Sequence, residues 1–183
     1  MARCFSLAVT GMLAAFAMTG PAVLAQEVVR ENVPGIQNFA RLETVVACTG
    51  ALDPEVAMPG IKRMGFASVI NLREVGEPGA VDPEEERRAA EAAGLRYFHV
   101  PFNGSAPEPK AADAFLAAIR TPGAEPALIH CAAGNRAAGM WLIKRLVVDR
   151  WETGRAIQEA NDLGLRSEPL RQFAIEYART RGQ

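Results

Sequence analysis

Apolar and polar positions along the chain follow two different periods, which predict strands and helices in turn. Short segments with mostly apolar residues, typical of buried strands, occur at 42–48, 68–72, 95–100 and 127–130. Apolar positions three and four residues apart, typical of amphipathic helices, occur at 53–64, 82–94, 110–120, 137–148, 153–162 and 168–179. This alternation predicts an α/β fold in which a central, mostly parallel sheet is flanked by helices on both faces.

Local signals predict where helices begin and how they pack. Asp53-Pro54 and Asp82-Pro83 each place a capping residue before a first-turn proline, and Pro59-Gly60 predicts an interruption of the first of these helices. The fourth helix is predicted to bury its apolar positions and to point Lys144 and Arg145 outward.

The first 25 residues are predicted to be a secretory signal peptide. Arg3 provides its positive start, an apolar stretch rich in small residues follows, and Val23-Leu24-Ala25 offers a cleavage site before Gln26. A membrane anchor is the alternative, but the apolar stretch is short against the ~20 residues that a span needs. We therefore expect an exported protein, periplasmic or secreted, without stable membrane insertion after cleavage.

The rest of the chain is predicted to hold one domain. Residues 26–39 show no hydrophobic period, which indicates an N-terminal arm or linker, and residues 40–183 form a domain of ordinary size. The whole chain has 20 basic and 21 acidic residues, a net charge of −1, and no dense run of Lys and Arg. This balance argues against nucleic acid as a partner.

The number of cysteines limits the disulfides that this chain can form. Of the three cysteines, Cys4 lies in the predicted signal peptide, which leaves Cys48 and Cys131. Two cysteines are too few for a small disulfide scaffold. In an oxidising compartment Cys131 is open to oxidation, and a disulfide with Cys48 is one conceivable outcome. Packing at a strand end is the favoured role for Cys48.

A strand, a turn and a helix meet in the sequence ALIHCAAGNR at 127–136. A residue at the carboxyl end of a buried strand lies where parallel sheets bind ligands. We expect Cys131 to act as a nucleophilic thiolate and Arg136 to bind two oxygens of an anion with its planar guanidinium. Backbone N–H groups of the turn are expected to bind the same anion, from Ala132, Ala133, Gly134 and Asn135. The alternative is a buried structural cysteine beside a helix-capping turn.

The motif resembles the site of the cysteine-dependent phosphatases. Within them it is similar to small bacterial proteins related to dual-specificity and tyrosine phosphatases, the group of the phosphatase-like domain of beta-lactamase hydrolase-like proteins. The resemblance covers roughly 39–165 and rests on four segments: His130 to Arg136, Val69-Ile70-Asn71-Leu72-Arg73, Cys48-Thr49-Gly50 with Asp53-Pro54, and His99-Val100-Pro101. It implies a protein-tyrosine-phosphatase-like fold. It also implies an enzyme that hydrolyses a phosphorylated small molecule or phosphoprotein, with no cofactor and no metal.

The resemblance further implies roles for individual residues. Cys131 attacks phosphorus while Arg136 and the turn amides hold the phosphoryl oxygens, and water then hydrolyses a cysteinyl-phosphate intermediate. His130 and Arg73 are expected to support the site rather than to react.

Departures from the family pattern leave two other functions open. Four residues separate Cys131 from Arg136 where most such phosphatases have five. The shorter spacing is also that of rhodanese-like sulfurtransferases, which carry a persulfide on the cysteine. Ala137 stands where a serine or threonine usually helps the sulfur leave, which predicts slow hydrolysis of the intermediate. A weakly active anion-binding module is the second alternative to a phosphatase.

The chain also departs from the family pattern at the position of the general acid. The family carries an aspartate after the strand at 97–101, and this chain has Phe102-Asn103-Gly104-Ser105 there. Four acids are the candidates to replace it: Glu74, Glu77, Glu108 and Asp113. Without an acid, aryl phosphates should be better substrates than alkyl phosphates, because protonation of the leaving oxygen matters less for them.

Overall fold

The computed structural model describes residues 27–43 and 45–181, so the predicted signal peptide lies outside the described residues. The strands form a six-stranded sheet in the order β1-β2-β3-β6-β4-β5. They are β1 (Val28–Arg30), β2 (Ala40–Leu42), β3 (Val46–Thr49), β4 (Ser68–Asn71), β5 (Arg96–His99) and β6 (Ala127–His130). The helices are α1 (Pro54–Arg63), α2 (Pro83–Ala92), α3 (Pro109–Ile119), α4 (Asn135–Val147), α5 (Thr153–Leu163) and α6 (Glu168–Arg179).

Parallel strands form the centre of the sheet, and β6 lies among them. It pairs with β3 on one side and with β4 on the other, while β1 and β2 add an antiparallel edge. Every residue of β3, β4 and β6 is buried, as their apolar runs predict. The carboxyl ends of β3, β6, β4 and β5 therefore share the edge at which parallel sheets bind ligands.

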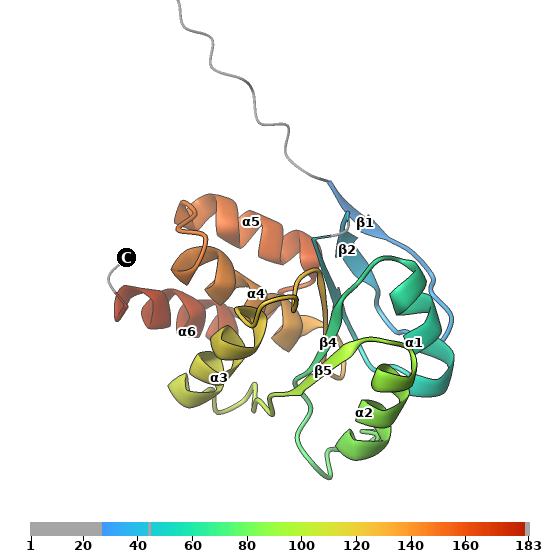
Figure 1. Cartoon of the computed structure of the whole chain (residues 1–183). Coiled ribbons are helices and arrows are strands. Elements are labelled where there is room, and N and C mark those ends of the chain that lie inside the picture. Colours follow the sequence, from blue (N-terminus) through green and yellow to red (C-terminus); the bar gives the residue numbers. More distant parts are fainter. Residues whose placement is uncertain (1–26, 44, 182–183) are drawn as a thin grey trace, which may run out of the picture.

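Helices cover both faces of the sheet. Figure 1 shows α1 and α2 on one face and α3 to α6 on the other. Successive residues of β6 pack on opposite faces of the sheet. Leu128 packs in the core on the α1–α2 side, and Ile129 in the core on the α3–α6 side. The α/β fold predicted from the sequence is confirmed.

The N-terminal part of the sheet differs from the prediction. The single strand predicted at 42–48 is a hairpin of β2 and β3, and Glu43 in the connecting turn has a φ of 43°. β1 occupies part of the segment 26–39, where the sequence predicted an arm or linker. Strands of three residues are too short to show a period of two, so the sequence pattern does not reveal them.

α1 is continuous where an interruption was predicted at Pro59-Gly60. It runs from Pro54 to Arg63 with Pro59 inside it. A proline in a helix interior removes one backbone hydrogen bond and costs about 3 kcal/mol. Burial of Ala57, Met58 and Ile61 against the sheet offsets this cost. The other predicted helices lie close to their observed bounds.

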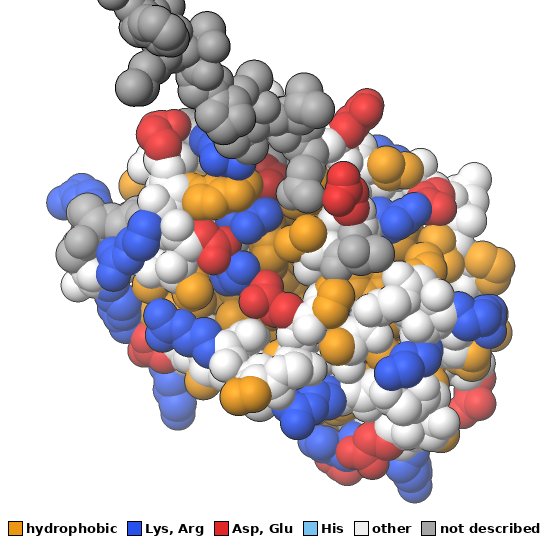
Figure 2. Space-filling model, turned by 45° about the horizontal axis from the view of Figure 1, so that its top comes forward, with side chains coloured by type: hydrophobic (Ala, Val, Ile, Leu, Met, Phe, Trp, Pro, Cys, Tyr) orange, Lys and Arg blue, Asp and Glu red, His pale blue; other side chains and the backbone are white. Residues whose placement is uncertain are grey.

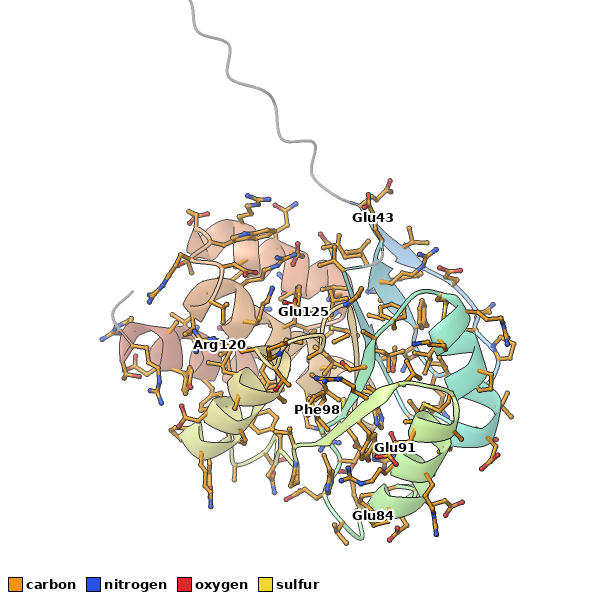
Figure 3. The ribbon with its side chains drawn as sticks, viewed as in Figure 1. Glu43, Glu84, Glu91, Phe98, Arg120 and Glu125 are labelled. Carbon is orange, nitrogen blue, oxygen red and sulfur yellow. The ribbon has the colours of Figure 1, made fainter. Side chains whose placement is uncertain are left out.

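The sequence predicts Lys144 and Arg145 on the outer face of α4, and this is wrong. Each is only 6% exposed, because Arg145 packs against Trp151 and against Glu159 of α5, and Lys144 against Glu125 in the segment before β6. Both charges are matched by carboxylates. Lys144 Nζ lies 3.0 Å from Asp149 and from Glu125, which is labelled in Figure 3, and Arg145 pairs with Asp149 and Glu159.

One face of the molecule carries charges of both signs. Figure 2 shows one face on which basic and acidic side chains are interspersed, with no large area of one sign. Among residues 27–43 and 45–181, no helix combines the length and the apolar character that crossing a membrane requires. The same residues contain no group of three or more His, Cys, Asp or Glu side chains that could hold a metal ion.

Candidate active site

Cys131 lies directly after β6, in the turn that leads into α4. The turn ends at Gly134, whose φ of 93° is a left-handed conformation that glycine adopts without strain. The Gly134 N–H donates to the Cys131 sulfur at 3.2 Å. Cys131 is only 1% exposed, and it lines a cavity at this edge of the sheet. The sulfur therefore lies at the bottom of the cavity, beside the N-terminus of a 13-residue helix.

Neighbouring segments hold the turn from outside. The Ala132 carbonyl accepts a hydrogen bond from Ala51 N–H at 3.1 Å, and the Ala133 carbonyl accepts one from the Asn38 side chain at 3.4 Å. The C=O and N–H of a trans peptide point in opposite directions. The N–H groups that follow these two carbonyls are therefore directed away from the supporting segments. An oxyanion site needs successive N–H groups that point to the same side.

Asn135 ties the site to the C-terminal helix. Its Oδ1 accepts hydrogen bonds from the backbone N–H of Arg166 and Ser167 at 2.8 and 3.1 Å. This contact brings Ser167 and Leu170, at the start of α6, to the rim of the cavity. Sequence reasoning missed both residues, because no local motif marks them.

Arg136 is held by a carboxylate 59 residues away in the sequence. Its Nη1 and Nη2 donate to the two oxygens of Glu77 at 2.9 and 2.6 Å, and Nη1 also donates to the carbonyls of Leu72 and Phe102. These bonds use the end of the guanidinium fork, which leaves its Nε edge for an anion. Burial alone would lower the pKa of Arg136, but Glu77 and the Cys131 sulfur raise it above the ordinary value.

The same contacts decide the role of Glu77. Partial burial would raise its pKa, but hydrogen bonds from Arg136 and from the Glu74 N–H, with the charge of Arg73 nearby, lower the pKa to about 2. Glu77 is thus ionised at neutral pH and has no proton to donate. The geometry argues against Glu77 as the general acid and makes it the residue that positions Arg136.

Of the other three candidate acids, only Glu74 lines the cavity. Glu108 stands at the N-cap of α3, and Asp113 faces the C-terminal helix, where it accepts a hydrogen bond from Tyr177 at 2.6 Å. That bond is the main cause of the lowered pKa of Asp113. Neither Glu108 nor Asp113 is brought near Cys131.

Arg73 supports the loop between β4 and α2 from behind. Its guanidinium donates to Glu77 at 3.1 Å and to the carbonyls of Pro78 and Gly79 at 2.6 and 2.9 Å. It is buried and does not line the cavity. Arg73 therefore acts on the site through Glu77.

His130 points away from the cavity, toward α2. Its Nε2 lies 2.7 Å from one oxygen of Glu86, although the two groups are not aligned as a hydrogen bond. The other Glu86 oxygen accepts from Asn71, which also donates to the Tyr97 hydroxyl. All four side chains are buried, so they tie α2 to the strands beneath the site. Sequence reasoning missed Glu86, because it is one of three acids in the first turn of α2.

The cavity has a volume of about 430 Å³. Asn103, Gly104 and Ser105, which replace the family's acid loop, form part of its wall. A Cβ on Gly104 would lie 3.0 Å from the Arg136 side chain, so a glycine allows this loop to lie against the arginine. The site thus combines a thiol, a backbone turn and a buttressed guanidinium around one opening.

Cys48 is a free, buried thiol in β3. The sheet register places it opposite Ile129, two residues before Cys131. Strand spacings then put the Cα atoms of the two cysteines about 8 Å apart, and a disulfide needs them within ~7 Å. Burial raises the pKa of the Cys48 thiol, as does Cys131. A disulfide would therefore require the backbone to move.

Fold and site together define a protein-tyrosine-phosphatase-like domain, in which Cys131 lies at the carboxyl end of β6 and lines a cavity with Arg136. The family model of the beta-lactamase hydrolase-like protein, phosphatase-like domain, matches residues 41–147. The chain belongs to this family.

Curated relatives agree with this assignment. Beta-lactamase hydrolase-like proteins of Xylella fastidiosa (strain Temecula1) and Agrobacterium fabrum are 34% and 35% identical to this chain over 125 and 100 residues. The alignments cover 66% and 52% of this chain but only 29% and 22% of the relatives. The chain thus spans less than a third of the length of these relatives.

Solved structures show the same fold. A Shewanella putrefaciens protein of the DUF442 phosphatase group gives a TM-score of 0.66 at 21% identity, covering 81% of this chain and 96% of that one. P. aeruginosa TpbA and the catalytic core of the S. cerevisiae PP-IP phosphatase Siw14 each give 0.61 at 19% identity, covering 86% and 80% of this chain and 91% and 88% of theirs. The predicted family and fold are confirmed: the chain belongs to a phosphatase-like domain family and has the fold of the protein-tyrosine-phosphatase-like structures. The comparisons do not favour the sulfurtransferase hypothesis.

Replacing Glu77 with glutamine should destabilise the protein at neutral pH and much less in acid. The pKa of Glu77 falls from an ordinary 4.5 to about 2 in the fold. Its stabilising effect is therefore complete above pH 4.5 and is lost as the pH falls toward 2. We expect the free energy of unfolding of Glu77→Gln to be lower by about 1–3 kcal/mol at neutral pH. Urea denaturation across this pH range measures the difference, and a difference independent of pH contradicts the Arg136–Glu77 assignment.

Proposed function

We propose that this domain is an exported cysteine-dependent phosphatase that hydrolyses phosphomonoesters through a cysteinyl-phosphate intermediate. The observation that carries the proposal is the position of the Cys131 sulfur, with the Gly134 N–H at 3.2 Å, in a cavity that Arg136 also lines. A thiolate attacks phosphorus, while amides and a guanidinium stabilise charge on the phosphoryl oxygens. The family and the fold support the same chemistry.

The reaction runs in two displacements at phosphorus. In the first, Cys131 Sγ forms an S–P bond as the ester P–O bond breaks, and the leaving oxygen takes a proton from solvent. The phosphoryl oxygens are held by the amides of the turn and by Arg136. In the second, water attacks phosphorus, the S–P bond breaks, and inorganic phosphate leaves with Cys131 again a thiolate.

The second displacement is the slower one in this proposal. Ala137 follows Arg136 directly and is fully buried at the start of α4. Its methyl group donates no hydrogen bond to the sulfur as it leaves phosphorus. The cysteinyl-phosphate should therefore accumulate during turnover.

The cavity walls favour good leaving groups. Among the described residues that line them, only Glu74 and Glu77 carry carboxyl groups, and Glu77 is the ionised partner of Arg136. We expect kcat/KM to rise steeply as the pKa of the leaving alcohol falls, since Glu77 has no proton to donate and the loop at 103–105 carries no carboxylic acid. A series of aryl phosphates and one alkyl phosphate measures this dependence, with Cys131→Ser as the blank. Equal rates across the series would show that a proton donor is present.

The substrate class is proposed from the site and from neighbours of the same fold. P. aeruginosa TpbA has been solved with phosphotyrosine, and Siw14 with citrate. We propose a phosphorylated small molecule or a phosphoprotein as the substrate here.

The proposed export rests on the predicted signal peptide at 1–25, and cell fractionation of the full chain tests it. Retention in the cytoplasm with an uncleaved N-terminus contradicts it.

A further inference from the structure

The cavity walls carry more negative than positive charge. Arg136 is the only cation among the described residues that line it, and its guanidinium is matched by the carboxylate of Glu77. Glu74 adds a second carboxylate, which has no hydrogen-bond or ion-pair partner within the described part of the chain. The other walls are uncharged apart from the nucleophile.

Nearby cations are turned away from the opening. Arg73 is buried, with its guanidinium on Glu77 and on the carbonyls of the loop behind it. Arg166 lies next to Ser167 on the rim, but its Nη1 donates to the carbonyls of Asn161 and Leu165 at the end of α5. Neither Arg73 nor Arg166 lines the cavity.

The turn itself adds no cation. Its two exposed side chains are those of Ala132 and Ala133, and Asn135 is engaged with the loop before α6. A bound phosphomonoester carries about two negative charges. Arg136 and the amides of the turn are the partners of these charges. A further anion beside it would meet the Glu74 carboxylate instead of a cation.

We propose that Glu74 determines specificity by charge. The site takes substrates in which the phosphate is the only anion and a neutral or cationic group lies beside it, and it rejects substrates with a second acidic or phosphorylated group there. This proposal rests on the proposed function and names the substrate class of the same site. A phosphotyrosine peptide with lysines beside the phosphotyrosine is a representative of the preferred class.

Three phosphotyrosine peptides that differ only at the flanking positions test the proposal. The flanks are lysine, alanine or glutamate, and binding is measured by calorimetry on the full chain carrying Cys131→Ser, which holds substrate without turnover. We expect affinity in the order lysine, alanine, glutamate, with about a tenfold span at low salt that shrinks as salt is added. Adding Glu74→Gln to Cys131→Ser should reduce this span by about threefold.

The matched control is Glu91→Gln in the same background. Glu91 is an exposed glutamate in the last turn of α2 and does not line the cavity (Figure 3). Glu91→Gln should leave the difference in affinity between the lysine and glutamate peptides unchanged. Equal affinities for the three peptides, a preference for glutamate flanks, no measurable binding, or a span that Glu74→Gln leaves intact each overturn the proposal.

Turnover separates this proposal from the function on which it rests. The unmutated chain is given the same peptides, and phosphate release is measured. Charge-ordered binding without any release by the unmutated chain would end the phosphatase assignment while charge selection stands. Release at equal kcat/KM from all three peptides would uphold the phosphatase and end charge selection.

Discussion

Replacing Cys131 with serine is expected to lower kcat for aryl phosphate hydrolysis by about 10⁴-fold or more. Serine keeps the size of the side chain and the hydrogen bond from Gly134, but its hydroxyl is not ionised at neutral pH and is a poor nucleophile. Binding of phosphate or vanadate should survive, since the amides and Arg136 are untouched. Steady-state kinetics and calorimetry with these anions measure the two effects separately.

Cys48→Ala is the matched control for this substitution. Cys48 is the other cysteine of the described chain, is fully buried, and packs in β3 on the same side of the sheet as Cys131. Its replacement should cost about 1 kcal/mol of stability and leave kcat nearly intact. Full activity in Cys131→Ser would contradict the account, as would an equal loss of activity in both variants.

Replacing Arg136 with alanine is expected to lower kcat/KM by about 10³-fold. The guanidinium supplies both a charge and a planar pair of donors for the phosphoryl oxygens, and the loss should fall on kcat as well as on KM because charge on those oxygens is stabilised in the transition state. Arg136→Lys should recover only part of the rate, since an ammonium group has no fork and cannot make both bonds to Glu77.

Arg96→Ala provides the control for a lost guanidinium. Arg96 begins β5, is exposed, and donates to the Pro122 carbonyl at the other end of the sheet. It should retain activity close to that of the unmutated chain. A loss confined to KM in Arg136→Ala would show that the guanidinium binds the ground state alone, and full rescue by lysine would rule out the forked contact.

The strand, turn and helix around Cys131 could be predicted because their signals are local. The apolar residues Ala127 to Ile129, a glycine and a helical pattern follow one another closely, and within the turn the Gly134 N–H donates to Cys131 only three residues before it. The alternation of strands and helices is a repeated local signal as well. It predicts the two-faced sheet without any knowledge of which strands are neighbours.

The contacts that buttress the site could not be predicted, because they join distant segments. Glu77 meets Arg136 across 59 residues, and Glu86 meets His130 only because α2 packs on β5, two strands away from β6 in the sheet. In the sequence both glutamates look like solvated acids. The outward placement predicted for Lys144 and Arg145 is wrong for the same reason, since Lys144 meets Glu125 and Arg145 meets Glu159, both in other segments of the chain.

Mass spectrometry of the intact protein, quenched during turnover of an aryl phosphate, tests the central claim most directly. The account predicts a gain of one phosphoryl group, located on Cys131, that persists because Ala137 slows its hydrolysis and that is absent from Cys131→Ser. A parallel sample treated with thiosulfate should stay unmodified. An unmodified protein after the aryl phosphate, or a gain of one sulfur on Cys131 after thiosulfate, would contradict the account.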